Sequence, residues 1–334
     1  MLLALLNKLT GTTKIILLHD SRMPLPEGMA HNVQIKDVMP SIVQRLIAEI
    51  WLAKSVAPED IVLCFGNLPP LLKLRGRTVV FLQNRYLIDD VPLDGFPLKV
   101  RLRLAMERLW LSKKMKNVDE FVVQTPTMER LLKQKTGGKI PVRILPFMAE
   151  SGGYSRKVSI PVLPKKNNFD FVYVASGEPH KNHRRLLEAW CLLAEEGIFP
   201  SLLLTLDEVR FATLCRGIDV MRQRHGLNVT NAGELPHQDV LSLYHKSGAV
   251  IYPSTFESFG LPLIEARQAC LPVLASELDY VRDVLDPEQT FNPESSVSIA
   301  RAVKRYLGKE EQALPLLDAN GFIERIVNPG ERLC

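Results

Sequence analysis

The chain has 334 residues, of which 46% are hydrophobic and 24% are charged. This composition excludes disordered and collagen-like proteins and fits about two globular domains of ~100–200 residues each. Residues 1–150 carry 22 Lys and Arg against 14 Asp and Glu, whereas the remainder carries 20 against 23, so the net charge of +5 hides an excess of cations in the first half.

Short apolar runs alternate with longer amphipathic segments through the first 150 residues. Runs rich in Val, Ile and Leu are typical of fully buried parallel strands, and they cover residues 14–18, 61–65, 78–82, 120–124 and 142–145. The segments between them predict helices over residues 40–55, 97–116 and 126–135, with prolines suited to a first helical turn.

Residues 149–168 interrupt this rhythm with a Ser-Gly-Gly sequence, two prolines and a Lys-Lys-Asn-Asn run. We therefore place a linker at 151–168. A second series follows, with strands expected at 169–175, 201–206, 228–231, 249–252 and 272–275, and helices at 183–196, 209–225, 236–246, 259–270 and 296–307.

Two successive series of alternating strands and helices predict an α/β protein with two doubly wound, Rossmann-like domains. The domains would span residues 1–150 and 169–309 and face each other across a cleft, leaving the tail at 310–334 free to pack back on the first domain. In such sheets ligands bind beyond the carboxyl ends of the strands. Function is therefore expected in the loops that follow strands.

The most informative loop follows the strand expected at 249–252 and reads Pro253-Ser-Thr-Phe-Glu257-Ser-Phe-Gly260-Leu-Pro-Leu-Ile-Glu265-Ala. The backbone N–H groups of residues 258–261 would form a helix N-terminus, which is a site for phosphate. Gly260 lets that backbone approach a ligand closely. Taken singly, Glu257 could merely complement the helix dipole and Glu265 could be solvated.

This string resembles glycosyltransferase family 4, a family of retaining enzymes with the GT-B fold, whose hallmark is two glutamates separated by seven residues. The matching positions are Pro253, Ser254, Glu257, Phe259, Gly260, Leu261, Pro262, Glu265 and Ala266. The resemblance implies that Glu257 is catalytic and holds hydroxyls of the donor sugar, and that Glu265 binds the ribose. It also implies that the distal phosphate lies against Ser258, Phe259, Gly260 and Leu261.

A second loop, Ser176-Gly177-Glu178-Pro179-His180-Lys181, follows the first strand of the second domain. A lysine there can neutralise a departing diphosphate. In the family this position carries a Gly-Arg…Lys pair, so Gly177 and the catalytic Lys181 match, whereas Glu178 stands near where an arginine is expected. We interpret His180 and His183 as ordinary loop and surface residues. Gly233 belongs to a turn that the resemblance places by the nucleobase, although a glycine there is also ordinary turn chemistry.

The first domain departs from the family pattern at two loops. His19 and Asp20 stand where many members have a glycine-rich loop, and Gln83, Asn84 and Arg85 stand where many have a histidine near the reacting sugar. A glutamine cannot exchange a proton near neutral pH. We interpret these five residues as candidates for the acceptor side of the cleft, with ordinary loop as the alternative.

The segment from Pro97 to Asn117 predicts a basic amphipathic helix. Apolar residues at 98, 102, 105, 106, 109 and 110 form one stripe, and seven Lys or Arg accompany a single acid, Glu107. Such helices lie on anionic lipid surfaces, unless the apolar stripe packs on the first sheet. Nucleic acid is disfavoured as the partner because no nucleic-acid motif appears.

The spacing of the cysteines and the lengths of the apolar runs indicate where in the cell the protein works. The five cysteines show no CxxC pair and no zinc-ligand spacing, which is typical of a reducing compartment. The apolar start is six residues long and lacks the basic region of a signal peptide, and no apolar run approaches ~20 residues. We therefore expect a cytoplasmic protein, with peripheral contact at the inner face of the membrane.

The resemblance to glycosyltransferase family 4 implies a hexosyltransferase that moves a sugar from a nucleotide-sugar donor to a saccharide acceptor, and the basic helix adds a lipid-linked saccharide as a candidate acceptor. The process would be bacterial polysaccharide or lipopolysaccharide assembly, with no cofactor and no metal. The alternatives are a nucleotide-sugar epimerase of the same fold and a non-catalytic nucleotide-sugar-binding protein. A dinucleotide oxidoreductase is disfavoured because no GxGxxG sequence follows a strand.

Overall fold

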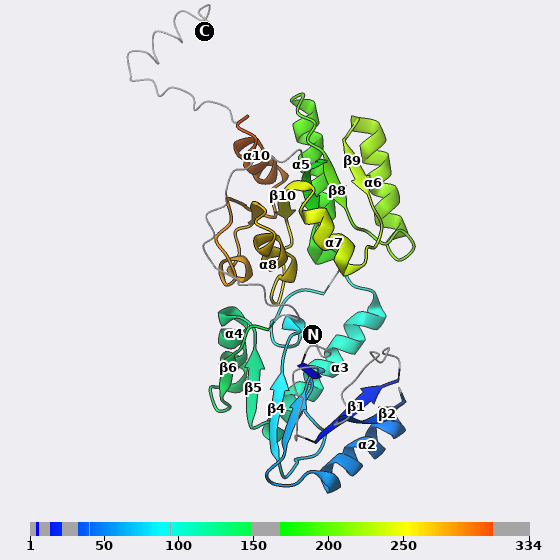
Figure 1. The fold of residues 1–334 in the computed structure, drawn as a ribbon, viewed down its shortest axis with the longest axis vertical. Helices are drawn as coiled ribbons and strands as arrows, with labels where there is room; N and C mark the ends of the chain where they lie inside the picture. The colour runs from blue at the N-terminus through cyan, green and yellow to red at the C-terminus, as the bar shows by residue number, and fades with distance from the viewer. Residues whose placement is uncertain are drawn as a thin grey trace, which may run out of the picture.

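The protein consists of two α/β domains stacked along the long axis of the molecule (Figure 1). The computed structural model describes residues 5–6, 14–21, 33–39, 41–93, 95–147 and 168–309. The N-terminal domain occupies the lower half of Figure 1 and the C-terminal domain the upper half. The predicted linker, apart from its last residue, and the predicted packing of the tail at 310–334 lie outside the described residues.

The C-terminal domain is built on a six-stranded parallel sheet with the order β12-β11-β10-β7-β8-β9. Its strands are β7 (Phe169–Tyr173), β8 (Leu202–Leu204), β9 (Val229–Asn231), β10 (Ser247–Tyr252), β11 (Val273–Ser276) and β12 (Gln289–Phe291). Its helices are α5 (His183–Glu195), α6 (Ala212–His225), α7 (His237–Tyr244), α8 (Leu261–Gln268), α9 (Asp279–Arg282) and α10 (Ser296–Tyr306). The central strands are apolar on both faces because helices cover both, and they form one continuous core.

The N-terminal domain contains two separate parallel sheets among its described residues. One is four-stranded, with β3 (Ile61–Cys64), β4 (Arg77–Phe81), β5 (Glu120–Val123) and β6 (Val142–Ile144) in that order. The other pairs β1 (Ile15–Asp20) with β2 (Val33–Val38), a strand that the apolar pattern did not predict. The helices are α2 (Ile42–Ser55), α3 (Leu98–Lys114) and α4 (Pro126–Thr136).

The prediction of fully buried strands was wrong for β1 and β6, which contain no buried apolar residue, and most plainly for β3. Its residues Ile61 and Leu63 are 68% and 50% exposed. The cause is position, since β3 lies at the edge of the four-stranded sheet. A strand at an edge can leave one face open and still pair its backbone with a neighbour.

Helix α3 packs through a different face from the stripe that its sequence suggested. Leu104 and Leu111 are buried against the first domain's core. Most of the predicted stripe faces solvent, with exposed fractions of 80% at Leu98, 60% at Leu102, 58% at Met106 and 55% at Leu109. The alternative that this stripe packs on the first sheet is therefore wrong for these four side chains.

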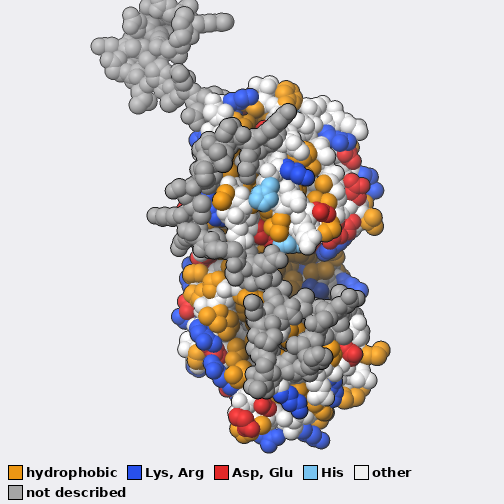
Figure 2. All heavy atoms as spheres, viewed as in Figure 1, with side chains coloured by type: hydrophobic (Ala, Val, Ile, Leu, Met, Phe, Trp, Pro, Cys, Tyr) orange, Lys and Arg blue, Asp and Glu red, His pale blue; other side chains and the backbone are white. Residues whose placement is uncertain are grey.

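The two domains touch through polar and aromatic contacts, and the surface is indented between the lobes (Figure 2). Arg130 on α4 pairs with Asp279 on α9 at 2.6 Å, and the backbone N–H of Thr127 donates to the carboxylate of Asp283 at 3.0 Å. The domains are thus held in contact beside the loops that follow the strands. No helix among the described residues is long and apolar enough to cross a membrane.

Candidate active site

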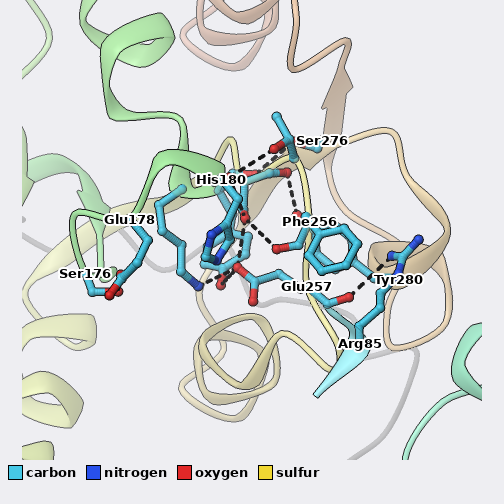
Figure 3. Close-up of polar contacts among 12 residues, drawn as sticks. Arg85, Ser176, Glu178, His180, Phe256, Glu257, Ser276 and Tyr280 are labelled. Carbon is cyan, nitrogen blue, oxygen red and sulfur yellow. Dashed lines mark hydrogen bonds and ion pairs between the residues drawn. The ribbon is translucent and has the colours of Figure 1, made fainter. Parts of the chain in front are cut away.

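The loop after the buried strand β10 carries Glu257, which is the centre of a polar cluster (Figure 3). Oε1 of Glu257 lies 2.8 Å from Oγ of Ser254, 3.0 Å from the hydroxyl of Tyr252 and 2.5 Å from Nζ of Lys181. Among the described residues, no hydrogen bond is recorded to Oε2 of Glu257. The carboxylate is therefore fixed through one oxygen and keeps the other for a ligand.

Lys181 reaches Glu257 because the loops after β7 and β10 are tied together. The hydroxyl of Tyr173 donates to the carbonyl oxygen of Lys181 at 2.6 Å. The side-chain amide of Asn182 donates to the carbonyl oxygens of Pro253 and Pro293 at 3.0 and 2.7 Å. Lys181 and Glu257 are only 14% and 13% exposed. The structure thus brings together the two residues that the sequence picked out as catalytic, although their roles stay predictions.

Glu178 lies near the position where an arginine was expected from the family resemblance. Its side chain is turned away from Glu257 (Figure 3). Its carboxylate accepts a hydrogen bond from Ser176 and pairs with Arg210 at 2.8 Å. Arg210 lies in the loop after β8, so a guanidinium reaches this side of the site from a neighbouring loop. Sequence reasoning missed Arg210 because nothing local to residue 178 indicates it.

Gly177 has a packing reason for its identity. A Cβ atom at this position would lie 2.4 Å from the ring of Phe211, so any side chain would displace that ring. The glycine is therefore explained by the close approach of Phe211, without a ligand. Its predicted donor-binding role stays untested.

The helix start predicted to hold phosphate is α8, which begins at Leu261 rather than at residue 259. Gly260 caps it in the left-handed conformation with φ +71°, which favours glycine. The Phe259 side chain is 7% exposed and belongs to the core, so only its backbone remains for a ligand. Oγ of Ser258 accepts a hydrogen bond of 2.9 Å from the backbone N–H of Arg85 in the other domain.

Glu265 lies inside α8 and is only 14% exposed, so the alternative of a solvated carboxylate is wrong. It contacts Nε2 of His237 at 3.0 Å and the hydroxyl of Tyr244 at 3.3 Å. Burial raises the pKa of this carboxyl group. Gly233 follows β9 with φ +76° and open space around its Cβ position, so turn geometry accounts for it.

A cavity of about 260 Å³ lies between the domains. Its lining combines amide, hydroxyl, carboxylate and aromatic groups, namely Asn67, Gln83, Asn84, Tyr86, His180, Phe256, Glu257 and Ser258. Gln83 and Asn84 thus line the cleft where the sequence placed them. His180, which we interpreted as an ordinary loop residue, lines it too.

The remaining first-domain candidates divide between the cleft and the two-stranded sheet. Arg85 pairs with Asp89 at 2.8 Å, and its guanidinium lies 4.4 Å from the centre of the Phe256 ring. His19 and Asp20 instead end strand β1, where His19 is buried and contacts Asp37 at 3.0 Å. The cavity lining does not include either of them.

His183 is not a surface residue, contrary to its interpretation from sequence. It is 2% exposed, and its ring lies 4.8 Å from that of Tyr173. Burial lowers the pKa of His183 to about 3, with the nearby positive charge of Lys181 as a smaller cause. No three His, Cys, Asp or Glu side chains in the described part of the chain are grouped to hold a metal ion.

A family model covers the domain that carries this site. Residues 156–316 match the family model described as "Glycosyl transferases group 1". The C-terminal domain belongs to the group 1 glycosyl transferases. Because the match includes both catalytic candidates, it places them inside the family domain.

Similar proteins cover the chain unevenly. O-antigen chain mannosyltransferase B of Escherichia coli is 32% identical over 120 residues, which are 34% of this chain and 30% of that protein. O-antigen chain mannosyltransferase RfbU of Salmonella typhimurium is 27% identical over 141 residues, covering 42% of this chain and 38% of that protein. The chain thus matches less than two fifths of the length of either relative.

Solved structures extend the fold match to both domains. HepE of Anabaena, crystallised with UDP and glucose, is 15% identical with a TM-score of 0.55, covering 83% of this chain and 77% of that one. A UDP-forming trehalose-phosphate synthase from Burkholderia vietnamiensis is 14% identical with a TM-score of 0.57, and the match covers 79% of this chain and 68% of that one. The protein therefore has the GT-B fold of two Rossmann-like domains.

Proposed function

We propose that this protein is a retaining glycosyltransferase that moves a sugar from a nucleotide-sugar donor to a hydroxyl of a saccharide acceptor. One observation carries the proposal: Glu257, paired with Lys181, stands four residues before the start of α8 and lines the cavity between the domains. A cation and a helix start together suit a diphosphate, because both stabilise negative charge. A carboxylate with a free oxygen suits sugar hydroxyls.

In the proposed reaction, the bond between the anomeric carbon and the donor's phosphate oxygen breaks as the acceptor oxygen bonds to the same face of that carbon. The acceptor's hydroxyl proton passes to the departing phosphate oxygen. Lys181 stabilises the charge that develops on this leaving group, which is where an enzyme lowers the barrier most. Glu257 orients the sugar through its free oxygen, and Glu265 binds the ribose.

The acceptor we propose is a lipid-linked saccharide in bacterial O-antigen or related polysaccharide assembly. The O-antigen mannosyltransferase relatives support this choice and make mannose the first donor sugar to test. The surface of α3 supports contact with a membrane, since its exposed apolar stripe is flanked by the exposed cations Lys99, Arg103 and Lys113. Such a surface suits the anionic inner face of the cytoplasmic membrane.

The proposal is tested by measuring nucleoside diphosphate release with UDP-, GDP-, dTDP- and ADP-sugars, with and without saccharide acceptors. We expect one donor to release nucleoside diphosphate quickly only when an acceptor is present. Conversion of the nucleotide sugar to an epimer without acceptor would identify an epimerase instead. Binding of a donor with no turnover over the acceptor panel would identify a binding protein.

A further inference from the structure

His180 is held in a fixed position between the two domains. It belongs to the 3-10 turn Pro179–Lys181, and its carbonyl oxygen accepts hydrogen bonds from the backbone N–H of Thr255 at 2.8 Å and from Oγ of Ser254 at 3.1 Å. The same loop is anchored by Asn182 on its other side. The backbone of His180 is therefore immobilised against the loop that carries Glu257.

The imidazole ring of His180 lies among three aromatic rings. Tyr86 and Phe96 come from the N-terminal domain, with ring centres 5.7 and 6.3 Å away, and Phe256 comes from the loop of Glu257 at 6.5 Å. These apolar walls shield part of the ring from water. Burial accordingly lowers the pKa of His180, and the charge of Lys181 lowers it further. The ring is thus neutral near pH 7, with one nitrogen as donor and the other as acceptor.

Neither nitrogen of this ring has a hydrogen-bond partner among the described residues. Nδ1 of His180 is buried and makes no hydrogen bond among the described residues, although the side chain lines the cavity between the domains. A buried polar atom without a partner is costly. Nδ1 is closed to solvent, whereas Nε2 is not, so Nε2 is the nitrogen that a ligand atom in the cavity can reach. Across the cavity stand the amide side chains of Asn67, Gln83 and Asn84.

The cavity matches the chemistry of a single sugar ring. Its volume of about 260 Å³ is below the ~300–1,000 Å³ usual for drug-sized ligands, so it suits one ring rather than a whole nucleotide sugar. Amide groups, a hydroxyl and a neutral imidazole both donate and accept, as sugar hydroxyls require. The apolar faces of Tyr86 and Phe256 suit the C–H face of such a ring.

We propose that His180 binds a hydroxyl of the sugar ring in this cavity, so that the C-terminal domain supplies the imidazole that the first domain lacks at Gln83. This inference rests on the proposed glycosyl transfer and adds the residue that recognises the sugar. The bound ring is either the donor sugar or the terminal sugar of the acceptor. The two sources predict different kinetic effects.

The test uses the full chain and three variants, with steady-state kinetics against each substrate. His180→Phe keeps a ring among the aromatic neighbours but removes both nitrogens, and we expect kcat/KM to fall about 10- to 100-fold with an unchanged melting temperature. His180→Gln, which restores a neutral donor and acceptor, should recover part of the loss. His245→Phe, at an exposed histidine on α7's C-terminal end, is the control and should match wild type.

A raised KM for the nucleotide sugar, with unchanged affinity for the free nucleoside diphosphate, would assign the ring to the donor. A raised KM for the acceptor alone would assign it to the acceptor. Wild-type kinetics in His180→Phe would overturn the role of His180 while leaving glycosyl transfer intact. Absence of turnover in wild type over the whole donor and acceptor panel would instead overturn the proposed function, and this inference with it.

Discussion

The two domains differ in how fully their sheets are covered. In the C-terminal domain β7, β8, β10 and β11 lie in one continuous core, and the residues facing the cleft are tied by hydrogen bonds from several loops. In the N-terminal domain β3 and α2 leave large apolar side chains in solvent, including Ile61 at 68% and Val43 at 67%. The difference indicates a rigid donor site facing a domain whose surface is available for partners.

The largest effect is expected when the cation at the centre of the proposed donor site, Lys181, is removed. Lys181→Met should lower kcat by about 100- to 1,000-fold, because the departing diphosphate loses the ammonium group that stabilises its negative charge. The fold should survive, as judged by circular dichroism and thermal unfolding. Lys246→Met, at an exposed lysine of the same domain, serves as the control. Turnover within a few fold of wild type would remove Lys181 from the mechanism.

The two glutamates should separate in their kinetic effects. Glu257→Gln should lower kcat about 100-fold, since Glu257 holds the reacting sugar. Glu265→Gln should raise the donor KM about 10-fold with little change in kcat, because a ribose contact is made equally before and during the reaction. Steady-state kinetics with both variants decides this. Equal and negligible effects would contradict both assignments.

The core of the C-terminal domain should be sensitive to acid through His183. Its pKa is near 6.5 when unfolded and about 3 when folded. Below pH 6.5 His183 therefore binds a proton in the unfolded chain but not in the folded chain. The free energy of unfolding then falls by about 1.4 kcal/mol for each unit by which the pH decreases. At pH 5 the loss is about 2 kcal/mol.

Urea unfolding at pH 7 and pH 5 measures this loss. His183→Phe should lack the part of the acid destabilisation that His183 causes, whereas His245→Phe should keep it. An identical pH dependence in wild type and His183→Phe would show that this imidazole is not buried in its neutral form.

The smallest effect concerns the exposed face of α3. Lys99→Gln and Lys113→Gln should each weaken binding to anionic vesicles about fivefold, as expected for ~1 kcal/mol per cation near such a surface. Lys139→Gln, an exposed lysine beyond the end of α4, is the matched control. Co-sedimentation with anionic and neutral vesicles measures it. Equal binding to both vesicle types would leave α3 without a membrane role.

Local sequence was enough to predict the loops that meet around Glu257, although the donor-binding roles of their residues stay predictions. Glu257, Gly260 and Glu265 lie within nine consecutive positions, and Lys181 lies in the loop that follows the apolar strand β7, so fold class predicts that the two loops meet at one edge of the sheet. The alternation of apolar runs with amphipathic segments likewise predicted all but one of the C-terminal strands. The strand β12, in which Phe291 is the only apolar residue of three, was missed.

Tertiary contacts account for what was missed. His180 lines the cavity because Tyr86 and Phe96 meet it from the other domain, which no local pattern reveals. Arg210 reaches Glu178 from another loop. The face through which α3 packs could not be read from its sequence, because apolar residues occur on both of its sides and the sheet selects one.

The central claim, sugar transfer with retention in the cavity between the domains, is tested most directly by following the reaction in one vessel by proton NMR. The spectrum reports the donor's anomeric signal, any epimer and the new linkage together. The account predicts acceptor-dependent loss of the nucleotide sugar and a new anomeric signal with the donor's configuration, both slowed about 100- to 1,000-fold in Lys181→Met. Inverted configuration, or an epimer formed without acceptor, would contradict it.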